Sequence, residues 1–172
     1  MTTRLFAFYD KRRDALWDPL MAEAAQAAQA GDWAKVAEKY DYILLQDPLY
    51  GRRAEMVKGY LEIGRAQARD KDFKKANVSL NKALSIDPTG ALAREAEAEL
   101  YSARAMLAEA EGRSGADDLA RARKAGGAQT LDMAIRQHMK ARRGWMLWTG
   151  VGTGALALAL VGLLILRKRG IE

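Results

Sequence analysis

The chain contains no cysteine, a single histidine and only three prolines. The lack of cysteine excludes a disulfide framework, a zinc site built from thiolates and a cysteine nucleophile. Runs rich in valine and isoleucine with alternating polarity, which are typical of strands, are also missing. The abundant residues are instead alanine, leucine, glutamate, lysine and arginine, which favour helices. The sequence therefore predicts an all-α protein.

The chain also lacks the motifs of common catalytic sites. There is no glycine-rich phosphate loop after a strand, no H-E-x-x-H and no G-x-S-x-G. We expect His138 to be a solvated side chain, because it stands among basic residues. Two groups of carboxylates are expected to lie on solvated helix faces or to act as N-caps: Glu95, Glu97 and Glu99, and Asp117 and Asp118. The sequence thus predicts no catalytic residue, metal site or cofactor, and the protein is not expected to be an enzyme.

The formal net charge of +6 is unevenly distributed. Residues 136–172 carry seven lysines and arginines against Glu172 alone, so they account for all of it and residues 1–135 are electrically balanced. A nucleic-acid-binding domain is expected to carry its basic residues on the folded domain itself. The charge distribution therefore argues against a nucleic-acid partner.

An uncharged stretch of 22 residues runs from Trp145 to Leu166. A helix of that length is about 33 Å long, which matches a hydrocarbon core of about 30 Å. Aromatic and basic side chains on both sides suit the two membrane interfaces and anionic lipid. The interface residues are Trp145, Trp148, Arg142, Arg143, Arg167, Lys168 and Arg169. The sequence predicts a single transmembrane helix at residues 145–166, followed by a short basic tail at residues 167–172.

No apolar signal segment precedes the rest of the chain. We therefore expect residues 1–143 to lie in the cytosol, with only the tail across the membrane. An alanine- and arginine-rich composition favours a bacterial inner membrane, and a mitochondrial outer membrane is the alternative. Within the span, Gly150 and Gly154 form a G-x-x-x-G pattern, which suits close helix–helix contact and a homodimer.

Two segments of the preceding region resemble each other at an offset of 40 residues: 32–48 and 72–88. Each begins with an aspartate that suits a helix N-cap, at Asp32 and Asp72. Apolar residues then recur at helical spacing, and an Asp-Pro pair ends each helix. Both segments are therefore predicted to be amphipathic helices of a repeated unit.

The repeat resembles the tetratricopeptide repeat family. In that family the second helix of a repeat has small, aromatic and small positions followed by a proline. These positions hold Ala76, Leu80, Ala83 and Pro88 in one unit, with Leu80 in place of the aromatic, and Val36, Tyr40, Ile43 and Pro48 in the other. The first helix has a large residue and then Leu-Gly, which Tyr60, Ile63 and Gly64 match. The resemblance implies a stack of helical hairpins over residues 19–125. Its second unit would begin with a lengthened helix across residues 49–70. Residues 90–125 would form a decayed third pair: Ala91–Glu111, a turn, and Ala116–Lys124.

In that family the first helix of each repeat lines a concave groove for peptides. By alignment, the resemblance implies a partner-binding groove on the second repeat at Lys58, Leu61, Glu62, Arg65 and Arg69. Four of these residues form one helical stripe with three basic side chains, which suits an acidic peptide. The alternative is a solvent face held by ordinary ion pairs.

Two segments flank the stack. Residues 1–18 are predicted to form a capping helix, or else a helix that binds a partner or folds into the groove. Residues 126–144 are predicted to hold a basic amphipathic helix with Leu131, Ile135 and Met139 on one face. This helix either rests on an anionic membrane surface or packs on the repeats.

These features suggest a tail-anchored adaptor or scaffold that binds a protein partner at a membrane. One alternative is a structural subunit of a secretion, motility or division complex. Another is an adaptor of the organelle-fission type, because the fission adaptor of mitochondria and peroxisomes also joins helical repeats to a C-terminal span and a basic tail.

Overall fold

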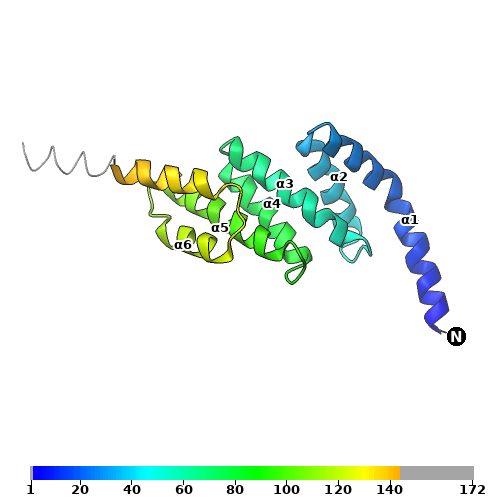
Figure 1. Cartoon of the computed structure of the whole chain (residues 1–172). Helices are drawn as coiled ribbons and strands as arrows, with labels where there is room; N and C mark the ends of the chain where they lie inside the picture. The colour runs from blue at the N-terminus through cyan, green and yellow to red at the C-terminus, as the bar shows by residue number, and fades with distance from the viewer. Residues whose placement is uncertain (1, 144–172) are drawn as a thin grey trace, which may run out of the picture.

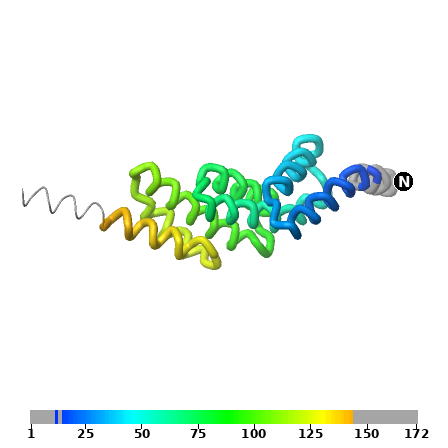
Figure 2. The backbone as a smooth tube through the Cα atoms, turned by 90° about the horizontal axis from the view of Figure 1, so that it is seen from above, coloured from blue at the N-terminus to red at the C-terminus, as the bar shows by residue number. Residues whose placement is uncertain are grey.

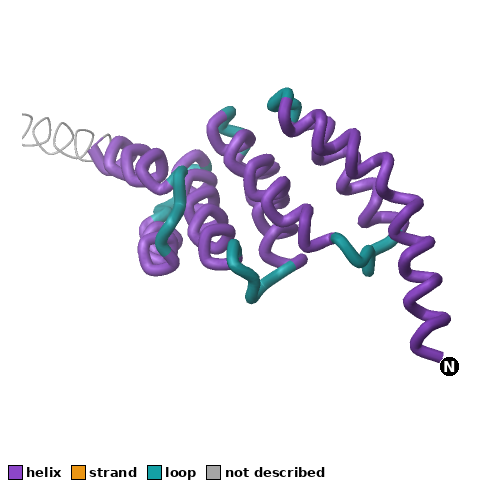
Figure 3. Tube along the Cα trace, turned by 45° about the vertical axis from the view of Figure 1, so that its right-hand side comes forward, coloured by secondary structure: helices purple, strands orange, loops and turns teal. Residues whose placement is uncertain are grey.

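The computed structural model describes the backbone of residues 2–143, together with the side chains of residue 12 and residues 15–143. Within that part of the chain every regular element is a helix, as the composition predicts (Figure 3). The predicted span, the tail and five of the predicted interface residues lie outside the described residues, as do Gly150 and Gly154. None of the helices within residues 2–143 combines the length and the apolar character that a bilayer crossing requires.

The helices pack as consecutive antiparallel hairpins along one long axis (Figures 1 and 2). The first pair is α1 (Thr2–Gln29) and α2 (Trp33–Gln46). The second is α3 (Met56–Arg69) and α4 (Phe73–Ile86), and the third is α5 (Ala93–Ala110) and α6 (Ala116–Ala125). A further helix at residues 131–143, here called helix 131–143, follows α6. The described chain is therefore a helical repeat-like stack.

The predicted N-caps are confirmed at both repeated helices. Asp32 accepts a hydrogen bond of 3.1 Å from the amide of Lys35, and Asp72 accepts one of 3.2 Å from the amide of Lys75. Each helix ends at the residue before an Asp-Pro pair, at Gln46 and at Ile86. A repeated sequence thus forms a repeated structure, because the same cap and the same proline bound each helix.

Two helix boundaries differ from the sequence prediction. Helix α1 continues through Pro19, so residues 1–18 are not a separate element. Both Ala15 and Pro19 are exposed, so water can solvate the carbonyl that the proline leaves without a donor. The predicted lengthened helix at residues 49–70 is wrong, because α3 begins only at Met56 after the short 3₁₀ helix Arg53–Glu55. The loop instead folds inward and buries Tyr50 completely.

The core runs along the stack between the hairpins. Gly64 on α3 allows close contact with α4, since a Cβ atom there would lie 2.5 Å from Leu80 Cγ. The rings of Tyr40 and Tyr60 pack at 5.6 Å between the first and second hairpins. Tyr60 also donates a hydrogen bond of 2.7 Å to Asp41, which pairs with Lys82 at 2.5 Å. Three helices from two hairpins are therefore joined at one point.

Candidate functional site

The predicted partner-binding groove on α3 is not one continuous surface. Lys58 and Arg69 are exposed and Glu62 is partly exposed, but Leu61 and Arg65 are buried. Leu61 belongs to the hydrophobic core. The structure thus places two of the five predicted residues inside the protein, because the next hairpin packs against this face of α3. The prediction that these five residues form an open peptide groove is therefore wrong.

Arg65 has an internal role instead. Its Nε donates a hydrogen bond of 2.7 Å to Glu99, and its Nη1 donates one of 2.6 Å to Glu62. Its Nη2 contacts Glu95. Burial opposes the charge of the guanidinium, but the hydrogen bonds to these carboxylates outweigh it and raise the pKa of Arg65 above its ordinary value. The guanidinium joins α3 to α5, and Glu99 does not lie on a solvated helix face, because its side chain is 0% exposed.

Glu99 extends the same hydrogen-bond network from α5 to helix 131–143. Its side chain is 0% exposed and accepts a hydrogen bond of 2.6 Å from the amide of Gln129. The amide and the hydroxyl of Thr130 also donate to it. A carboxylate at the first free amides of a helix satisfies donors that have no partner within the helix and interacts favourably with its dipole. Glu99 therefore caps helix 131–143 from α5.

Helix 131–143 is docked at two further points. Gln137 donates a hydrogen bond of 2.9 Å to the carbonyl of Met106. The Nδ1 atom of His138 lies 2.5 Å from Oε1 of Glu109, which also accepts a hydrogen bond of 2.8 Å from the amide of Gly115. His138 is only 15% exposed, so its predicted solvated position is wrong.

The apolar face of this helix agrees with one of the two predicted arrangements. Ala134 is buried, and Leu131 and Ile135 pack against the core, whereas Met139 is half exposed. The helix packs on the repeats through this face. Its basic residues remain outside, with Arg136, Lys140, Arg142 and Arg143 all exposed.

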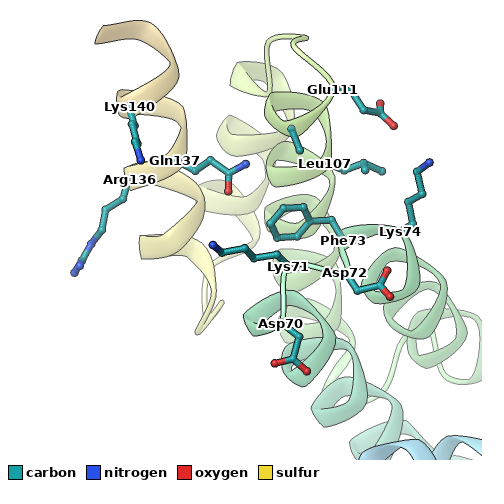
Figure 4. Close-up of a pocket in the computed structure, with 11 residues that line it drawn as sticks. Asp70, Lys71, Asp72, Phe73, Lys74, Leu107, Glu111, Arg136, Gln137 and Lys140 are labelled. Carbon is teal, nitrogen blue, oxygen red and sulfur yellow. The ribbon is translucent and has the colours of Figure 1, made fainter. Parts of the chain in front are cut away.

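A cleft of about 910 Å³ opens where three segments meet (Figure 4). The α3–α4 turn and the start of α4 contribute residues 70–74, and the end of α5 with its C-cap contributes Leu107, Ala110 and Glu111. Helix 131–143 contributes Arg136, Gln137 and Lys140. Lys71 extends towards helix 131–143, with the Phe73 ring beside it, and Lys74 and Arg136 stand at opposite edges. The sequence analysis did not identify this cleft. Lys71 and Lys74 are separated in the chain from Arg136 and Lys140 by the whole third hairpin, so no local pattern joins the two pairs.

Within the described part of the chain, no group of three or more histidine and carboxylate side chains is arranged to hold a metal ion. No family model, no curated protein and no solved structure matches the chain. The arrangement of the helices alone defines the class: an all-α stack of helical hairpins on which a basic helix, residues 131–143, is docked.

Proposed function

We propose that the protein is an adaptor of the tetratricopeptide-repeat type, tethered to a membrane by residues 145–166, whose hairpin stack binds a protein partner beside the bilayer. The observation that carries this proposal is the docking of helix 131–143. Glu99, Met106 and Glu109 on α5 hold this helix against the stack, and the uncharged stretch begins only two residues after it ends. A docked helix limits the orientations that the stack can take relative to the segment that follows.

A tether of this kind has a clear physical use. Confinement at a surface raises the effective concentration of a binding module for any partner on the same surface, without a new contact. The exposed basic residues of helix 131–143 favour a surface that carries anionic lipid, at about 1 kcal/mol for each charge close to it.

The membrane part of the proposal is tested by fractionation of cells that express the full chain or a chain ending at Arg143. We expect the full chain in the membrane fraction, resistant to alkaline carbonate and released by detergent, and the shortened chain in the soluble fraction. A full chain that carbonate releases would contradict the tether. Fusion of residues 136–172 to a fluorescent protein would then show which membrane the segment selects.

The partner part requires a separate test. A photo-crosslinking amino acid at an exposed position of the stack, such as Lys58 or Lys140, is activated in intact membranes that contain the full chain. We expect a discrete protein adduct at one position and not at the other. Adducts to lipid alone at both positions would contradict an adaptor.

A subunit of a larger membrane assembly is the second candidate, favoured by a different surface. Leu16 on α1 is 71% exposed, Leu45 near the end of α2 is 76% exposed, and Leu49 in the loop after α2 is 70% exposed. A contact with another subunit would remove such side chains from water. This candidate predicts that Leu45→Glu disrupts a complex seen by native electrophoresis of detergent extracts, whereas the adaptor needs no stable complex.

A further inference from the structure

The cleft of Figure 4 carries an excess of positive charge, and this excess is larger than a count of its lining residues indicates. Four basic residues line the cleft together with three acidic residues, and two of these acidic residues also have cationic partners outside it. The basic residues are Lys71, Lys74, Arg136 and Lys140. Asp72 caps α4 and pairs with Lys75 at 2.7 Å, and Glu111 pairs with Arg113 at 2.5 Å. Both partner cations lie outside the lining. The cleft is therefore a favourable place for an anionic group.

The backbone at Lys71 supports a role for its side chain. Its φ angle is +65°, in the left-handed region, and no other non-glycine residue of the described chain has a positive φ. The matching position of the first hairpin, 40 residues earlier, holds Gly31 with a φ of +74°. A lysine is less favourable than glycine in this conformation. Outliers of this kind are often retained where the side chain has a function.

The cleft also has an apolar floor. Phe73 from α4 and Leu107 and Ala110 from α5 are the apolar residues that line it. Figure 4 shows Phe73 and Leu107 between Lys71 and Lys74. A small inorganic anion would leave this floor empty. A volume of about 910 Å³ lies within the range of pockets that accept a ligand with several groups. The combination suits a chain segment that presents acidic side chains around at least one apolar side chain.

We propose that this cleft is the partner-binding site and that it takes an acidic peptide segment, with an aromatic or aliphatic side chain seated on Phe73 and Leu107 and its carboxylates near Lys71, Lys74 and Lys140. The inference rests on the proposed adaptor function and places its site at the junction of three segments, not at the predicted groove on α3. The docked helix 131–143 forms one wall, so the site exists only while that helix stays on the stack.

The test uses the full chain in nanodiscs of phosphatidylcholine, a zwitterionic lipid, and fluorescence anisotropy. The probes are labelled peptides from a library in which Leu-Phe is flanked by aspartate and glutamate in varied order. The same library with asparagine and glutamine is the charge control, and Ala-Ala in place of Leu-Phe is the apolar control. We expect binding of members of the first library only, weakened by added salt because exposed charges are screened.

Three variants locate the site. The double substitution Lys74→Glu with Lys140→Glu is expected to weaken peptide binding by about tenfold or more, since like charges now face the ligand. Ala110→Trp fills the floor without a change of charge and should also abolish binding. Lys58→Glu, an exposed lysine of α3 outside the cleft, is the matched control and should leave the affinity within about twofold. Lys71→Gly should weaken binding while it raises the melting temperature.

Several results would overturn the inference. Equal binding of the acidic and the amide libraries would exclude charge recognition, and equal loss in Lys58→Glu and in the cleft variants would exclude this location. Displacement of bound peptide when phosphatidylglycerol enters the nanodiscs would show a lipid headgroup site instead. If no peptide binds while the full chain remains carbonate-resistant in membranes, this inference falls and the tether stands. If the peptide binds but carbonate releases the chain from membranes, the inference stands and the tether falls.

Discussion

Arg65 and Glu99 form an ion pair inside the protein, with 2.7 Å between Nε and Oε1 and side chains only 3% and 0% exposed. The two residues belong to α3 and α5, and Glu99 also caps helix 131–143. The pair therefore connects the second hairpin, the third hairpin and the helix that forms a wall of the cleft. Its removal should affect both stability and the position of that helix.

Substitution of Arg65 by methionine is expected to lower the free energy of unfolding by about 3–5 kcal/mol, because Glu99 would remain buried without its cation. Urea denaturation of the full chain in detergent, followed by circular dichroism, measures this change. Arg69→Met is the matched control, because Arg69 is exposed on the same helix, and it should cost less than about 0.5 kcal/mol. Equal effects of the two substitutions would refute the structural role of Arg65.

Thr130→Val should loosen helix 131–143 without a change in side-chain shape. The substitution removes the hydroxyl that donates to Glu99 and leaves a buried acceptor with one partner fewer. We expect hydrogen exchange at the amides of residues 133–138 to accelerate by about tenfold, which corresponds to one hydrogen bond of about 1.4 kcal/mol. Ser85→Ala serves as the control, since the Ser85 hydroxyl bonds only within its own helix. Unchanged exchange in Thr130→Val would argue that the apolar face alone holds the helix.

Lys71→Gly is predicted to stabilise the protein by about 1 kcal/mol, because glycine adopts the left-handed conformation without a steric penalty. The opposite change at the matching turn, Gly31→Ala, should destabilise it by a similar amount. An added Cβ at Gly31 meets nothing within 4 Å, so the cost there would be conformational only. Thermal melting of both variants provides the measurement. A destabilised Lys71→Gly protein would show that the lysine side chain stabilises the turn through contacts.

Gly64→Ala should lower the free energy of unfolding by about 1–3 kcal/mol, since the new methyl group would overlap Leu80. The overlap is confirmed or excluded by the double variant Gly64→Ala with Leu80→Ala. We expect its cost to be smaller than the sum of the two single costs, because the cavity left by Leu80 receives the new methyl group. Additive costs would show that the two helices can separate slightly to admit the group.

Alkaline pH should destabilise the protein partly through Tyr60. Burial, and then the hydrogen bond to Asp41, raise the pKa of this phenol far above its model-peptide value of 10.0. The unfolded chain releases the proton near pH 10, whereas the folded chain retains it. Its effect on stability is therefore constant below pH 10, and stability falls as the pH rises above that value. In Tyr60→Phe this fall should be shallower in urea denaturation between neutral and alkaline pH. An unchanged slope would assign the fall to other groups.

Much of the fold follows from local signals in the sequence. The capping aspartates at 32 and 72 and the Asp-Pro pairs predict both repeated helices, and the third pair begins and ends within two residues of its predicted bounds. The composition predicts helices throughout. These features depend on neighbouring residues in the chain, so a sequence pattern is enough to predict them.

The functional surface depends on contacts between segments that are distant in the chain. The stripe of Lys58, Glu62, Arg65 and Arg69 has the same helical spacing whether it faces water or another helix, and only the packing of α5 decides that Arg65 is buried. The same holds for Glu99 and His138, whose partners are 29 to 34 residues away.

The sequence by itself determined the all-helical class, the two repeated helices with their caps, and the concentration of positive charge after residue 135. Only the tertiary structure decided which charges are internal, which face of helix 131–143 is covered, and where Lys71 meets Lys140 around one cleft. The physical reason is the distance along the chain over which each kind of interaction acts. Caps, turns and periodicity act within a few residues, whereas burial and charge pairing depend on segments that only the folded chain brings together.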